Sequence, residues 1–374
     1  MTLHKLTEIA KKVGIILGII IGTGMSLYVL VQTGTLIKDM ISPPPIQPPT
    51  HVYNALPPLQ FPKNAVDTKL MYTLNTITGG LPDFPDRLNV YPIKHNEPSL
   101  LNLNKVRTKV AGVGFLDYTG YTLPEKYLGD VIYEWDDQKD FTRKLVFNIV
   151  TFNFNLDSNY LFSFSALGAE RLSTQGNAIL TTKTFLENMS LFPTDIDLTK
   201  TKPQLLSIKN GALMPTTSLS KTQVIRVDLY QKDIQYALNT GIPQKPKGFK
   251  MVDIQLPVMY PHPPYSTMSF WIASSQNGPT VGAARFFHQD SIIQKDLDAT
   301  YAIKTAKEAF DELQKGKGYI ASYDGFDSNI AINDVYLAYY AGDQLQSYLM
   351  PIIVFEGKNG FFAYVSAVKN DWIK

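Results

Sequence analysis

The sequence predicts an α+β fold in which one N-terminal transmembrane helix is followed by antiparallel sheets, each packed with a helix. Three observations predict it. An uncharged run, VGIILGIIIGTGMSLYVLV, occupies residues 13–31. Beyond residue 62, short β-branched and aromatic segments bounded by turn residues are typical of strands. Single helical patterns interrupt these strands without regular β-α-β alternation, which favours antiparallel sheets.

The uncharged run is long enough to cross a membrane. At about 1.5 Å per residue it spans roughly 28 Å, close to the ~30 Å hydrocarbon core. Three lysines precede it, at Lys5, Lys11 and Lys12. Lys38 and Asp39 follow it, and their opposite charges cancel. The positive-inside rule therefore predicts a cytoplasmic tail at 1–12, a single-pass anchor in the plasma membrane and an extracytoplasmic remainder. A cleaved signal peptide is the alternative, but it would need a shorter apolar region and a small-residue cleavage site.

Three glycines recur every fourth residue within this run, at Gly14, Gly18 and Gly22. They would lie on one face of the predicted helix, where small residues let two membrane helices approach closely. The spacing predicts a homodimer formed through this segment. The alternative is that glycine is simply common in membrane helices.

A proline-rich segment follows, with eight prolines in the 21 residues 42–62. Fixed φ angles and missing N–H groups disfavour helix and central strand. The composition predicts an extended spacer of the polyproline type. A proline-rich ligand for aromatic grooves is the alternative.

The remainder is predicted to form two α+β domains, at 63–240 and 249–374, separated by the Pro/Gly/Lys loop 241–248. In the first domain a helical pattern lies at 177–191. Its predicted strands are 105–115, 129–135, 144–156, 160–166 and 224–230. In the second domain, an apolar stripe followed by two glycines predicts a helix at 298–315. Its predicted strands are 250–259, 267–274, 278–287, 330–340, 348–356 and 361–368.

The C-terminal segment 300–368 combines an Ala-rich helix with the strands INDVYLAYY, SYLMPIIVFEG and GFFAYVSAV. It resembles a PepSY-type domain, a family in which a helix packs on an antiparallel sheet outside the membrane and which is often implicated in restraining proteases. The whole layout is similar to membrane-anchored regulators of bacterial sensor histidine kinases. The resemblance implies regulation by protein contact and carries no site residue with it.

Charge and cysteine content exclude several classes of protein. Lys and Arg number 35 against 33 Asp and Glu, and three lysines against Glu8 place the +2 excess within residues 1–12. Because the remainder is neutral, a nucleic-acid binder is not expected. The absence of Cys excludes disulfides and thiolate metal sites. No glycine-rich nucleotide motif occurs, so the sequence predicts no cofactor.

Adjacent aromatic residues near the C-terminus form the first candidate site. Neighbouring strand residues point to opposite faces of a sheet, so each pair would present one ring outward. Tyr339, Tyr340, Phe361 and Phe362 are therefore a candidate partner surface. The alternative is that they pack in the core and along edge strands.

The acidic stretch Glu134, Trp135, Asp136 and Asp137 is the second candidate. It follows a predicted strand, which favours a solvated hairpin turn. The alternative is a carbohydrate subsite in which Trp135 stacks on a sugar and the carboxylates accept its hydroxyls.

Motifs for catalysis are weak. Ser218 and Lys221 match S-x-x-K, but they run into a strand pattern and the companion motifs are absent. His288 ends a predicted strand, which favours a hydrogen-bonded histidine, with a pH-sensing role as the alternative. Asp195 follows a helix and is predicted to cap it or to lie in a turn. The sequence thus predicts no catalytic or metal-binding residue.

Together these features predict a membrane-anchored extracytoplasmic protein without enzymatic activity. It would act in regulation or assembly through contacts with another envelope protein. Two alternatives stay open, an envelope hydrolase acting on glycan or peptide and a surface ligand-binding module.

Overall fold

The computed structural model describes residues 22–26, 28–33, 48–66, 70–116, 120–121, 124–137, 142–167, 174–236, 254–275, 278–291 and 299–374. The chain divides into two compact units. The first comprises Met1–Pro48 with Asn239–Val252, and the second comprises Pro49–Leu238 with Asp253–Lys374. The loop predicted to separate two domains, at 241–248, lies outside the described residues.

The predicted transmembrane helix is not supported. In the described part of the chain, no helix is both long and apolar enough to cross a membrane. Residues 22–26 and 28–33 are helical. Gly22 lies in this helix, whereas Gly14 and Gly18 fall outside the described residues. The transmembrane, single-pass and signal-anchor assignments are corrected by this finding.

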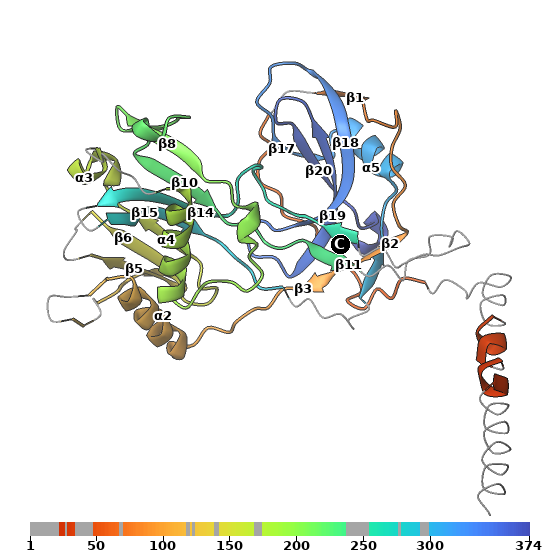
Figure 1. Cartoon of the computed structure of the whole chain (residues 1–374), viewed down its shortest axis with the longest axis horizontal. Helices are drawn as coiled ribbons and strands as arrows, with labels where there is room; N and C mark the ends of the chain where they lie inside the picture. Colours follow the sequence, from red (N-terminus) through yellow and green to blue (C-terminus); the bar gives the residue numbers. More distant parts are fainter. Residues whose placement is uncertain are drawn as a thin grey trace, which may run out of the picture. The chain divides into compact units, whose positions relative to one another are not determined.

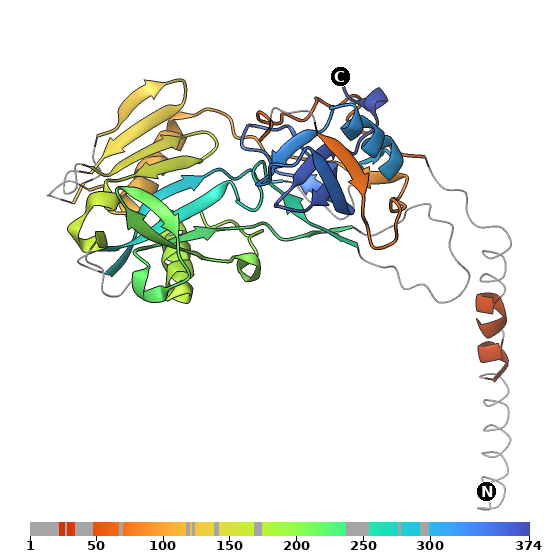
Figure 2. The same ribbon diagram turned by 90° about the horizontal axis from the view of Figure 1, so that it is seen from above.

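The predicted α+β class is also corrected. The structure is mostly β-sheet, with 37% of its residues in strands and 21% in helices. The larger sheet has nine strands, all paired antiparallel. In spatial order they are β4 (Lys126–Gly129), β5 (Ile132–Asp136), β6 (Lys144–Asn148), β7 (Phe154–Asp157), β15 (Gly278–Phe286), β14 (Met268–Ser275), β10 (Val224–Asp228), β8 (Gln204–Lys209) and β9 (Ala212–Pro215). Figure 2 shows the cyan strands β14 and β15 lying between the yellow and the green strands. Residues distant in sequence therefore form the centre of this sheet.

Two helices, α2 (Leu100–Gly112) and α4 (Gln175–Asn188), pack with the nine-stranded sheet (Figure 1). The segment of α2 was predicted as a strand because of its valines. Leu103, Val106 and Val110 are buried at helical spacing, and the Ser99 side chain accepts a hydrogen bond from the Leu101 N–H at the helix start. The opposite face carries the short helices η1 (Tyr160–Phe162) and α3 (Phe164–Leu167), where a strand was predicted.

The second sheet is mixed, not purely antiparallel as predicted. Its main strands, in spatial order, are β1 (Met71–Leu74), β18 (Asn329–Tyr340), β19 (Tyr348–Gly357), β20 (Phe362–Ser366) and β17 (Tyr319–Ser322). Strand β1 pairs parallel with β18, as does β13 (Val258–Met259), and β3 (Tyr91–Pro92) adds to β19. Two small sheets pair β11 (Ile234–Tyr236) with β12 (Ile254–Leu256) and β16 (Thr300–Ala302) with β2 (Arg87–Asn89).

Helix α5 (Ala306–Gln314) packs against β20 of the second sheet. It starts eight residues later than predicted, because Thr300–Ala302 is strand β16. A capping box fixes the start: the Thr305 hydroxyl accepts from the Glu308 N–H, and the Glu308 carboxylate accepts from the Thr305 N–H. Ala309, Phe310 and Leu313 are its buried face.

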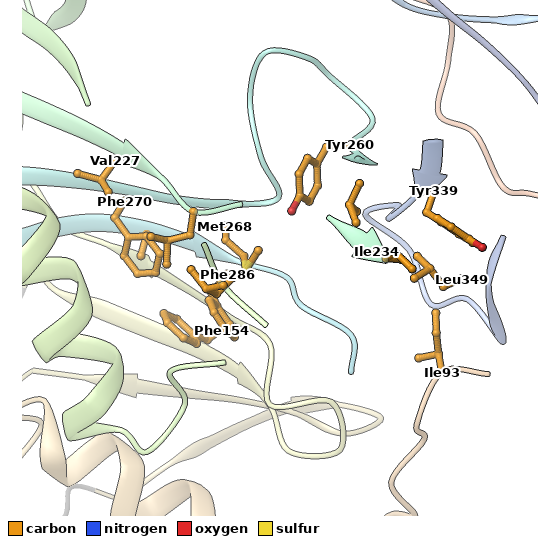
Figure 3. Close-up of a cluster of buried hydrophobic side chains, with 14 of the residues drawn as sticks. Ile93, Phe154, Val227, Ile234, Tyr260, Met268, Phe270, Phe286, Tyr339 and Leu349 are labelled. Carbon is orange, nitrogen blue, oxygen red and sulfur yellow. The ribbon is translucent and has the colours of Figure 1, made fainter. Parts of the chain in front are cut away.

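A single buried cluster contains side chains of both sheets (Figure 3). From the nine-stranded sheet it includes Phe154, Phe270 and Phe286, and from the second sheet Tyr339 and Leu349. The rings of Phe154 and Phe286 stack, with centroids 5.1 Å apart. Burial of such rings is the main stabilising contribution available to a chain without disulfides.

The second half of the proline-rich segment belongs to this folded unit and is not a free spacer. Leu56 is fully buried, its N–H donates to the Trp372 carbonyl at 2.8 Å, and its carbonyl accepts from the Lys374 N–H at 2.9 Å. The Phe61 ring stacks on Tyr319 with centroids 5.0 Å apart. The non-proline residues make these contacts, so the missing proline N–H groups cost no ladder hydrogen bonds.

Shortening Leu56 tests this packing. We expect Leu56→Ala to lower the free energy of unfolding by about 2–5 kcal/mol, because it leaves a cavity in a fully buried site. Leu345→Ala is the matched control, since that leucine is 57% exposed. Urea unfolding of both variants is the measurement, and equal effects of the two changes would contradict the placement of Leu56.

Candidate functional site

An acid–base pair joins two loops of the larger unit. His288 follows β15, and Asp195 lies in the loop after α4. The His288 Nε2 lies 3.0 Å from Asp195 Oδ1, and Gln231 Nε2 donates to Asp195 Oδ2 at 2.7 Å. The His288 side chain is only 7% exposed. The pairing spans 93 residues of sequence, so the local pattern at Asp195, which indicated a cap or turn, could not reveal it.

Two opposing effects set the protonation of Asp195. Burial alone would raise the pKa of its carboxyl, but the hydrogen bonds and charge of His288 and the amide of Gln231 outweigh burial and lower that pKa. The neighbouring Tyr260 hydroxyl accepts from the Gln231 N–H at 2.9 Å, and burial raises the pKa of that phenol. The hydrogen bonds from His288 and Gln231, with the charge of His288, therefore hold the carboxyl ionised.

The space beside this pair is too small for a substrate. A cavity of about 10 Å³ lies against His288, Gln231 and Gln346. That volume holds about one water molecule. The pair can thus orient its loops and support the ionised form of Asp195, but an organic molecule does not fit next to it.

A second, much larger space is an open groove beside α4. Its volume is about 460 Å³. It is bounded by the end of α2, by α4 and by the start of β15, and we call it the α4 groove. Its lining residues are Gly112, Val113, Arg143, Leu180, Thr181, Thr184, Phe185, Asn188, Pro279, Thr280 and Val281. These side chains are apolar or neutral except for one arginine.

That arginine, Arg143, is already balanced. Its Nη1 donates to the Val113 carbonyl and to Asp137 Oδ2, each at 3.2 Å. Its guanidinium also lies over the Phe115 ring, 4.7 Å from the centroid. Since the Asp137 side chain is only 7% exposed, this ion pair is largely desolvated and fixed in place. The α4 groove therefore presents little net charge.

The wall of the groove formed by β15 is a strand with one neighbour. β14 pairs with β15 from Gly278 to Phe286, with a shift of register between Val281 and Ala283. β7 pairs only with the last three residues, Ala284–Phe286. Among the described strands, none pairs with Gly278–Val281 on the β7 side.

Two contacts end β7 at this point. The Ser158 hydroxyl donates to the Gly282 carbonyl at 2.6 Å. A Cβ on Gly282 would lie 2.7 Å from the Tyr160 ring, so glycine is required for this close approach. The chain therefore turns away after Asp157, leaving the first residues of β15 beside the groove.

The acidic stretch predicted as a turn or sugar subsite lies on strand β5. Alternation along the strand points Trp135 and Asp137 inward, and they are 0% and 5% exposed. Glu134 and Asp136 lie on the other face, where Asp136 Oδ1 is 3.2 Å from Lys144 Nζ. The buried indole cannot stack on a sugar, so both interpretations are corrected.

The aromatic residues proposed as a partner surface are mostly core. Tyr339, Tyr340 and Phe361 are fully buried, and Phe362 is partly buried. The reason is that both faces of the second sheet are covered. Tyr339 belongs to the large core cluster, while the Tyr340 ring packs against Phe61, 4.8 Å away.

The remaining chemical motifs form no site. The Ser218 hydroxyl lies 2.9 Å from the Ser220 hydroxyl at the start of η3 (Leu219–Lys221). A serine activated by Lys221 would instead need the hydroxyl to reach the amine. Within the part of the chain that the structure describes, no group of three or more His, Asp or Glu side chains could hold a metal ion.

Because the pKa of Asp195 is lowered in the folded protein, we expect the stability of the fold to depend on pH. The folded-state pKa lies below the unfolded value of about 3.9, so the ionised carboxyl stabilises the fold above about pH 4. That contribution is lost as the pH falls through the lowered folded-state pKa. We expect Asp195→Asn to cost about 1–2 kcal/mol at neutral pH, with the difference from wild type shrinking in acid.

Urea unfolding across this pH range measures the effect. Asp343→Asn, at an exposed position, is the matched control and should change little at any pH. A cost for Asp195→Asn that stays constant down to about pH 2 would contradict the assigned charge state.

Comparison with known proteins adds a likeness to solved structures. No family model matches the chain. No curated protein matches it either. Among solved structures, the chain is similar to the crystal structure of an uncharacterized protein from Eubacterium rectale ATCC 33656, with a TM-score of 0.40 and 13% sequence identity over 82% of this chain and 92% of that chain.

Proposed function

We propose that this protein has no enzymatic activity and acts in regulation or assembly by holding a partner polypeptide in the α4 groove. The observation that supports this is the contrast between the small cavity beside His288 and the α4 groove. The acid–base pair has room for about one water, whereas the groove of about 460 Å³ has no acid–base pair in its lining. Pockets that bind small molecules typically measure about 300–1,000 Å³, so the groove is large enough to hold bound groups.

The lining of the α4 groove suits a polypeptide partner. Leu180 is 58% exposed, which is unusual for a leucine in the middle of a helix that packs on a sheet. Thr181, Thr184 and Asn188 follow it along α4 and offer hydroxyl and amide groups. An exposed apolar centre with neutral polar groups around it is the usual composition of a protein-binding surface.

We place the partner among proteins of the cell envelope. The support for this is the resemblance of the segment 300–368 to a PepSY-type domain, a family found outside the membrane. Fractionation of cells that produce the protein tests the location, and recovery of the protein in the cytoplasmic fraction alone would contradict it.

Substitution of Leu180 tests the proposed function. We expect Leu180→Glu to reduce partner binding at least about tenfold, because a carboxylate would be placed on the apolar centre of the contact without a counter-ion. Cross-linking in intact cells, followed by mass spectrometry, measures the captured partner. Leu219→Glu is the matched control, since Leu219 is 68% exposed and lies outside the groove.

Two outcomes would contradict the proposal. One is a partner that cross-links equally to wild type and to Leu180→Glu. The other is the absence of any stoichiometric partner in cells that produce the protein. Because Leu180 is exposed, both glutamate variants should keep the unfolding midpoint of the wild type, which shows that any lost binding is not lost folding.

A further inference from the structure

We propose that the α4 groove binds its partner by strand addition: an extended, uncharged segment of the partner pairs with residues Gly278–Val281 of β15. This inference rests on the proposed function and names the chemistry of its partner. It requires an open strand edge, space for side chains next to that edge, and a lining that selects against charge.

The open edge follows from the unequal lengths of neighbouring strands. β15 has nine residues, and β7 covers only three of them. In an antiparallel strand, alternate residues direct their N–H and C=O groups to opposite sides. Among the described strands, only β14 pairs with Gly278–Val281, so part of the backbone groups of this segment point toward the groove. Pro279 contributes no N–H and can only accept a hydrogen bond.

The length of the open edge sets the size of the occupant. Four residues at about 3.3 Å each make an edge of roughly 13 Å. At Gly282 the edge closes, because its carbonyl already accepts from the Ser158 hydroxyl and the Tyr160 ring covers it. An added strand would therefore occupy the space that β7 would fill if it continued beyond Asp157.

The groove provides the space for side chains. Alternate side chains of an added strand would point toward the helix face of the sheet, where Leu180, Thr184 and Phe185 line the groove. Backbone pairing then supplies affinity, and these contacts supply selectivity, as in other complexes formed by strand addition.

The electrostatics select an uncharged segment. The one charged residue in the lining, Arg143, is paired with the buried Asp137 and lies over Phe115. A charged side chain entering the groove would be desolvated without a new counter-ion, which costs binding energy. The occupant is thus a short run of Thr-, Val- or Ala-like residues in extended conformation.

The outer edges of the nine-stranded sheet are less suitable. They are β9 and β4, and β4 begins with Lys126, a residue type that protects sheet edges against pairing. Neither strand lines the α4 groove. The interior edge of β15 is the one that combines open backbone with a binding space.

A peptide titration tests the inference. The probe is the fluorescein-labelled hexapeptide acetyl-Thr-Val-Thr-Ala-Thr-Val-amide, and its twin carries a methyl group on every backbone amide nitrogen. We expect saturable binding of the probe to the full-length protein below about 1 mM by fluorescence anisotropy. The methylated twin should bind at least about tenfold more weakly, because it has no backbone N–H to donate.

Protein variants locate the bound peptide. Leu180→Glu should abolish binding of the probe, while Leu219→Glu should bind it as wild type does. Equal binding of the probe and its methylated twin would overturn strand addition. No saturation below about 1 mM would overturn it as well.

These results separate the inference from the proposed function. If Leu180→Glu loses the cellular partner but the two peptides bind alike, the groove holds its partner through side chains and only strand addition fails. If the probe binds as expected but cells yield no partner, the proposed function fails while the groove remains a peptide-binding site.

Discussion

The incomplete pairing of β15 with β7 is the constraint on which the rest of the account depends. Over Ala284–Phe286 the two strands pair, and the stacked rings of Phe154 and Phe286 join the centre of the large core. Over Gly278–Val281, β14 is the only described strand that pairs with β15. The C-terminal end of β15 thus pairs with β7 inside the sheet, whereas its N-terminal end borders the α4 groove. The Ser158 hydroxyl and the Tyr160 ring, both acting on Gly282, fix where one role changes to the other.

The acid–base pair and the open groove lie in different places in this molecule. His288 and Asp195 have space for about one water beside them. The open groove, in contrast, is lined by neutral side chains and by an arginine that Asp137 already balances. A reaction needs both space and a titrating group at one place. The described residues place them apart.

The sequence predicted local structure best where patterns were long. The strands predicted at 330–340 and 348–356 match β18 and β19 closely, because both are long β-branched and aromatic runs. The predicted secondary structure was wrong where the local preference of the residues differs from the structure that packing favours. Valines suggested a strand where α2 forms, and prolines suggested a spacer where Leu56 is buried. The groove could not be predicted, because it depends on where β7 stops beside a strand more than 120 residues later in the chain.

Amide hydrogen exchange of β15, resolved residue by residue by NMR, tests the central claim most directly. If the edge at Gly278–Val281 is open, at least one of the amides of Gly278, Thr280 and Val281 should exchange at least about 100-fold faster than the amides of Ala284 and Phe286. If all three amides exchange as slowly as those of Ala284 and Phe286, the edge is closed. The groove would then offer no strand to a partner.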